Sequence, residues 1–144
     1  MDFKNRKNEG PAVTYTLVPK VLPGKEDGQR LYYAQSRARG ELGLEEMAER
    51  ISRNCTLTRS DIIGVLAALE DEVCQGLCNG EIVRLGGIGS LQAGICSEGG
   101  ERPGDFTAGR IRRLRVLFRP AGLLKKSLAH TRFERVAVNG KEEM

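Results

Sequence analysis

Residues 79–91 read NGEIVRLGGIGSL, and the pattern changes from helix to strand within this stretch of the 144-residue chain. Asn79-Gly80 is a typical helix ending, because glycine readily adopts the left-handed conformation that follows a last helical turn. The β-type run 81–85 comes next, and the glycines of residues 86–89 separate it from a second β-type run that begins at Ser90. We therefore predict a helix that ends near residue 79, followed by two strands joined by a tight turn.

A phosphate-binding loop is the alternative interpretation of this glycine cluster. It is disfavoured because no Gly-Lys-Ser/Thr ending follows, and because the next segment is a strand and not a helix whose N-terminus could hold phosphate. Catalysis also has little support, since His130 is the only histidine and no serine or cysteine motif accompanies it. The carboxylates of residues 70–72 point in different directions around a helix, as on a solvated face. We expect no enzyme, no cofactor and no small-molecule substrate.

Two segments with helical periodicity precede residue 79. The first opens after Gly43, and its apolar face consists of Leu44, Met47, Ala48, Ile51 and Cys55. The second starts at Thr58, which has in Asp61 a partner at the spacing of a reciprocal N-cap. Its apolar stripe consists of Ile62, Leu66, Leu69, Val73 and Leu77, with Ile63, Ala67 and Cys74 alongside. This is more apolar surface than one short neighbouring helix can cover, so the sequence predicts a further partner surface.

The N-terminal part of the chain has a β pattern. Residues 12–21 (AVTYTLVPKV) and 30–37 (RLYYAQSR) are rich in β-formers and flank a polar turn, so residues 12–38 are predicted to be a hairpin. Pro19 predicts that the first strand lies at a sheet edge. We expect four parts: a mobile N-terminus (1–11), a β-segment (12–42), a main domain (43–135) and a charged tail (136–144).

The remaining composition excludes several classes of protein. The four cysteines form no Cys-x-x-Cys pair, and together with one histidine they predict no zinc site. No segment approaches the roughly 18 apolar residues of a membrane span. The first ten residues lack the apolar stretch of a signal peptide, so we expect a cytoplasmic protein.

Charge is distributed unevenly along the chain. Residues 41–81 have a net charge of −6 and residues 109–144 of +7, although the whole chain carries only +4. Between Asp105 and Glu134 there is no carboxylate, but there are eight basic residues: Arg110, Arg112, Arg113, Arg115, Arg119, Lys125, Lys126 and Arg132. Such a run usually binds an anionic partner or lies on a well-solvated face. An ordered basic strand favours a nucleic-acid surface.

The arginines alternate with apolar residues, which predicts a strand. Within it, Arg113, Arg115 and Arg119 share one face, opposite the apolar residues Leu114, Val116 and Phe118. Arg110 and Arg112 need extra twist or a bulge to join that face. Pro120 ends the strand and precedes a predicted helix with an apolar side made of Leu123, Leu124 and Leu128. The alternative is a solvated face whose arginine stems cover the sheet.

The order of elements and the residues together resemble the bacterial histone-like HU/IHF family of DNA-binding proteins. Residues 79–91 are similar to that family's helix-ending glycine and acid, short strand and Gly-aromatic-Gly-Thr-Phe motif, with Ile88 and Leu91 in place of the two aromatics. Residues 118–120 and 124–126 resemble the end of its last strand and the basic start of its C-terminal helix. The longer HU-like variants, which carry an N-terminal β-segment, are the better match to the whole chain.

This resemblance implies an α+β fold with two helices, a sheet, an extended β-arm and a C-terminal helix, to which this chain adds an N-terminal hairpin. It also implies an intertwined homodimer whose two arms enter the DNA minor groove, with a proline wedge at each tip. The arm corresponds to the segment around 97–109, and the wedge candidate is Pro103 beside Arg102. The arm is shorter here and contains acids, and residues 91–96 carry no basic group.

The sequence thus predicts a histone-like, nucleoid-associated homodimer that binds double-stranded DNA without sequence preference. The expected DNA-binding residues are Arg102, Pro103, Arg110, Arg112, Arg113, Arg115, Arg119, Lys125 and Lys126. The alternative is an HU-like dimer that binds another protein through its arms or N-terminal hairpin and does not bind DNA.

Overall fold

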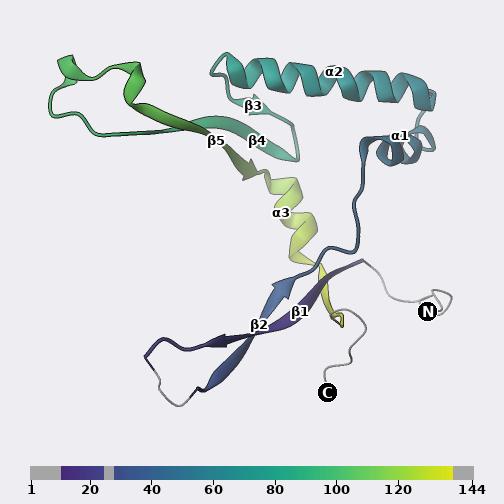
Figure 1. Ribbon diagram of the computed structural model, residues 1–144. Coiled ribbons are helices and arrows are strands. Elements are labelled where there is room, and N and C mark those ends of the chain that lie inside the picture. Colours follow the sequence, from purple (N-terminus) through teal and green to yellow (C-terminus); the bar gives the residue numbers. More distant parts are fainter. Residues whose placement is uncertain (1–10, 25–27, 138–144) are drawn as a thin grey trace. The chain divides into compact units, whose positions relative to one another are not determined.

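The computed structural model describes residues 11–24 and 28–137 and shows an α+β chain with three helices and two small sheets in that part (Figure 1). The predicted mobile N-terminus and charged tail fall almost wholly outside the described residues. The main elements are β1 (Ala12–Val21), β2 (Arg30–Ser36), α1 (Leu44–Ser52), α2 (Arg59–Cys78), β3 (Val83–Arg84), β4 (Gly89–Ser97), β5 (Ile111–Pro120), α3 (Gly122–Ala129) and β6 (Arg132–Arg135). Two short 3₁₀ turns, Pro103–Asp105 and Ala108–Arg110, lie between β4 and β5.

The chain forms two compact units. One comprises residues 42–128, and the other combines the described parts of 1–41 and 129–144. The second unit is discontinuous because β6 pairs in parallel with the first residues of β1, so that Val13 lies opposite Phe133. Consequently Arg132, which belongs to the basic run of the sequence, lies in a different unit from the other seven basic residues.

The sheet of the discontinuous unit has the order β2-β1-β6, and β1 and β2 form the predicted antiparallel hairpin. The prediction that Pro19 places β1 at a sheet edge is wrong, since β1 is the central strand. The proline is tolerated because β6 pairs only with residues 12–15, which leaves the side of β1 away from β2 unpaired at Pro19.

Helix α2 begins and ends where the sequence predicts. The Thr58 hydroxyl accepts a hydrogen bond from the Asp61 backbone N–H (3.2 Å), and the Asp61 carboxylate accepts one from the Thr58 N–H (3.3 Å). At the other end Asn79 is the C-cap, and Gly80 has a φ of 75°. The N-cap and the C-terminal glycine thus set the ends of α2, and the end of α2 sets where the following strands begin.

Replacing Thr58 by alanine is expected to destabilise the protein by about 1 kcal/mol, because the Asp61 backbone N–H at the start of α2 loses its hydroxyl acceptor. Urea unfolding followed by circular dichroism at fixed protein concentration measures the loss. The control is Ser60→Ala, in the same exposed first turn but outside the capping box. Equal midpoints for the two variants would contradict the role of the cap.

The glycine cluster forms a tight turn between β3 and β4, as predicted. The Leu85 N–H donates to the Gly89 carbonyl (2.8 Å), and the Ile88 N–H donates to the Leu85 carbonyl (3.1 Å). A Cβ at Gly89 would lie 2.3 Å from the Arg119 carbonyl oxygen, so only glycine permits this approach to β5. The turn thereby brings the start of β4 against the end of β5.

The unit of residues 42–128 has a very small core. Helices α1 and α2 pack together, and among the described residues only Ala48 of α1 and Ile62 of α2 are buried hydrophobics. Much of the predicted apolar face of α1 stays uncovered, including Leu44 and Ile51, and Cys55 lies beyond the end of the helix. The apolar side of α3 is also largely uncovered, at Leu123 and Leu128. A single chain therefore leaves much of its predicted apolar surface in water.

Candidate nucleic-acid interface

The candidate interface is one face of the antiparallel pair β4–β5, which extends to the arm (Figure 1). The strand register places Arg119, Arg115 and Arg113 opposite three β4 residues, Ser90, Gly94 and Cys96. Directly opposed residues lie on the same side of a sheet, so the three arginines share a face with small or polar partners. All three are exposed. We call this surface, made of Arg113, Arg115 and Arg119, the arginine face.

The other face of the same two strands is apolar. In the strand register, the β5 residues Phe118, Val116 and Leu114 lie opposite the β4 residues Leu91, Ala93 and Ile95. Leu114 and Val116 are 72% and 65% exposed in the single chain. The pair of strands is therefore amphipathic, with the charge on one side only.

A bulge alters the alternation near the arm. Cys96 lies opposite Arg113 and Ser97 lies opposite Ile111, so Arg112 is an extra residue in β5. A bulge of this kind changes the direction of the side chains that follow it. A bulge was expected in this region, and it falls at Arg112 itself, so simple alternation along β5 does not assign Arg110 and Arg112 to a face.

The arginines differ in their contacts. The Arg112 Nε donates to Glu98 Oε1 at 2.9 Å in an exposed ion pair, and Arg110 Nη1 donates to the Gly99 carbonyl at 2.7 Å. Arg112 lies in β5 and Arg110 just before it, and both contact the loop that follows β4, so they brace the arm. For Arg113, Arg115 and Arg119, by contrast, the described part of the chain provides no ion pair. Their charge is available to a partner.

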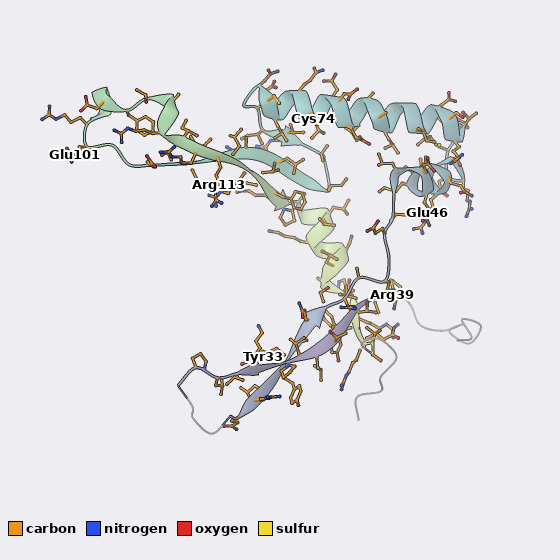
Figure 2. All side chains as sticks on the ribbon, in the orientation of Figure 1. Tyr33, Arg39, Glu46, Cys74, Glu101 and Arg113 are labelled. Atoms are coloured by element: carbon orange, nitrogen blue, oxygen red, sulfur yellow. The ribbon has the colours of Figure 1, made fainter. Side chains whose placement is uncertain are left out.

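The arm tip carries Arg102 and Pro103, both exposed. Pro103 is the first residue of a 3₁₀ turn, which the Asp105 N–H closes by donating to the Arg102 carbonyl (3.1 Å). Figure 2 labels Glu101 in this loop and Arg113 on β5. The tip therefore combines one basic residue with two acidic ones, and the positive charge is concentrated on β5.

Helix α3 contributes the last two predicted residues. Lys125 and Lys126 are exposed, and neither makes an ion pair with the described residues. The helix is held against the glycine turn, because the Leu124 N–H donates to the Gly87 carbonyl (3.2 Å) and the Ala121 N–H to the Ile88 carbonyl (3.0 Å). The two lysines thus follow closely on the end of β5.

One basic residue of this surface is absent from the residues predicted from the sequence. Arg84 of β3 lies opposite Ser90, which itself lies opposite Arg119, so Arg84 extends the arginine face onto a third strand. The alternation of Val83 and Arg84 together with the tight turn could have indicated this position.

Within the described residues, no group of three His, Cys, Asp or Glu side chains is placed to hold a metal ion. No described helix has the length and apolar character that crossing a membrane requires.

Comparison with known proteins identifies the fold. A crystal structure from Bacteroides vulgatus ATCC 8482, described as that of a candidate DNA-binding protein, matches with a TM-score of 0.62 and 16% identity over 92% of this chain. The match covers 51% of the Bacteroides chain, so the present chain spans about half of its length. An Anabaena HU–DNA cocrystal structure matches with a TM-score of 0.49 and 17% identity, over 62% of this chain and 99% of the HU chain.

No curated protein matches the sequence. A protein family does match: residues 12–135 fit the family described as an HU domain fused to wHTH, Ig, or glycine-rich motif. The predicted resemblance to HU and to its longer variants, and the predicted α+β fold, are confirmed. The chain belongs to this HU-HIG family.

Proposed function

We propose that this chain is a histone-like architectural protein that binds double-stranded DNA as a homodimer, without sequence preference and without enzymatic activity. The observation that carries the proposal is the strand register, which gathers Arg113, Arg115 and Arg119 on one exposed face with no carboxylate opposite them. Membership of an HU-domain family supports it. A nucleoid location in the cytoplasm would follow from this function.

The proposed mechanism is electrostatic. Arginine and lysine side chains that neutralise backbone phosphates release condensed counterions, and this release supplies most of the free energy of non-specific binding. The arginine face and the α3 lysines contact phosphates, whereas Arg110 and Arg112 mainly brace the arm. Phosphate contacts carry no direct sequence information, which is consistent with architectural binding. Arg102 and Pro103 are the candidates for contact at the arm tip.

The exposed apolar surface supports a homodimer. Leu69 on α2 is 46% exposed, and the apolar face of β4–β5 is uncovered in the single chain. Contiguous exposed apolar patches mark protein interfaces. A second copy presents the same surfaces, and a two-fold axis lets each copy cover those of the other. Sedimentation equilibrium is expected to give twice the chain mass.

A salt titration with a random-sequence duplex tests the proposed function. We expect log Kobs to fall linearly with log[salt], with a slope of about −0.9 for each phosphate neutralised. Fluorescence anisotropy of a labelled duplex between about 50 and 200 mM salt measures this slope. Absence of binding at the lowest salt concentration, or binding that does not respond to salt, would exclude the proposed mechanism.

A second candidate function is that of a protein-interaction module. The sheet β2-β1-β6 favours it, because one face holds an apolar pocket of about 580 Å³ lined by Val13, Tyr15, Leu17, Ala34, Ser36 and Phe133. The outer edge of β2 is also unpaired within the described residues, and such an edge can accept a strand from another protein. The same titration distinguishes the two functions, since a pure interaction module does not bind the duplex.

A further inference from the structure

Three side chains on neighbouring strands form a row across the sheet at the end away from the arm. Arg84 of β3 lies opposite Ser90 of β4, and Ser90 lies opposite Arg119 of β5. Directly opposed residues share a face, so both arginines flank the Ser90 hydroxyl on the same side of the sheet. We call these three residues the Arg84–Ser90–Arg119 row.

The row lines a small open pocket. Its volume is about 280 Å³, and its walls are Arg84, Gly86, Gly89, Ser90, Arg119, Pro120 and Ala121. This lies below the roughly 300–1,000 Å³ that is usual for small-molecule sites, so the pocket suits a single compact group. None of the lining residues is acidic.

The two arginines of the pocket lack a counter-charge. Neither makes an ion pair with a described residue, and both are exposed. Two like charges beside one pocket repel each other unless an anion lies between them. The guanidinium groups offer planar donor pairs that match phosphate oxygens, and the serine hydroxyl offers one more donor.

We infer that the Arg84–Ser90–Arg119 row binds one phosphodiester of the DNA backbone in each protomer. This inference rests on the proposed function and adds a defined phosphate site to it. The site is separate from the arm end of the arginine face, because Arg113 lies six residues from Arg119 along β5, about 20 Å at about 3.4 Å per residue. A single phosphate cannot reach both ends.

The test compares four proteins by duplex titration: the wild type, Arg84→Ala, Arg119→Ala and the double variant. Loss of a charged hydrogen bond weakens binding about tenfold, and each protomer of the homodimer loses one, so Arg84→Ala is expected to weaken binding about a hundredfold. The slope of log Kobs against log[salt] is expected to become smaller by about 0.9 for each phosphate that is no longer neutralised. Because both arginines hold the same phosphate, the double variant is expected to lose less affinity than the two single variants together.

The matched control is Arg53→Ala, which removes one exposed arginine that is paired with Glu49 on α1. Arg84→Gln, which keeps most of the aliphatic stem, is expected to behave as Arg84→Ala does. Equal affinities and slopes for Arg84→Ala and Arg53→Ala would overturn the site while leaving the proposed function intact, and so would strictly additive effects of the Arg84 and Arg119 substitutions. Failure of the wild type to bind the duplex at low salt would overturn the proposed function and this site together.

Discussion

Replacing Arg113 and Arg115 together by alanine is expected to abolish most DNA binding at moderate salt. In a homodimer the double substitution removes four phosphate contacts, and at about 0.9 per contact the salt slope becomes smaller by about 3.6. If the wild-type and variant lines meet near 1 M salt, affinity at about 0.1 M falls on the order of a thousandfold. Anisotropy titrations over a series of salt concentrations measure both quantities.

A matched control separates local contacts from net charge. Arg50→Ala with Arg53→Ala removes the same number of charges from α1 and its C-cap, where both arginines are paired with glutamates one turn earlier. We expect this control to change the slope little. If both double variants flatten the slope equally, binding depends on the overall charge of the protein and not on the arginine face.

Replacing Leu69 by aspartate is expected to prevent assembly of the folded dimer. The side chain lies on α2 at a position that is half exposed in the single chain but is covered in the proposed dimer. Burying an unpaired carboxylate costs several kcal/mol, a large part of the roughly 5–15 kcal/mol that stabilises a typical domain. When folding and assembly are coupled, such a loss removes both. Circular dichroism and sedimentation velocity measure the outcome.

Gln75→Asp is the matched control for this substitution, because it places the same carboxylate on an exposed position of α2 away from Leu69. We expect its helix content and its mass to equal those of the wild type. A Leu69→Asp protein that stays folded at an unchanged mass would show that this face of α2 is not part of an interface.

The local features of the fold could be predicted because short-range chemistry determines them. The Thr58–Asp61 cap and the Asn79-Gly80 ending predicted the bounds of α2 to within a residue of those observed. The hairpin of β1 and β2 followed from its β-formers and polar turn. The parallel pairing of β6 with β1 could not be predicted in this way, since no local pattern specifies which distant strand a short strand joins.

In the candidate site, too, the features set by one strand could be predicted, and those set by pairing between strands could not. Simple alternation along β5 placed Arg113, Arg115 and Arg119 on one face, and the register agrees with that arrangement. The ion pair of Arg112 with Glu98 and the position of Arg84 depend on a bulge and on cross-strand register. Bulges and register are properties of paired strands, and the sequence of a single strand does not predict them.

The pairing of β1 with β6 has a consequence for synthesis of the protein. Val13 and Phe133 are neighbours across the sheet, yet a ribosome that adds about 5–20 residues per second needs about 6–24 s to make the roughly 120 residues between them. During that interval residues 42–128, which make up the other unit, are synthesised completely, while one edge of β1 still lacks its partner. Nascent chains on neighbouring ribosomes expose the same edge, and it is there that pairing between different chains competes with correct folding.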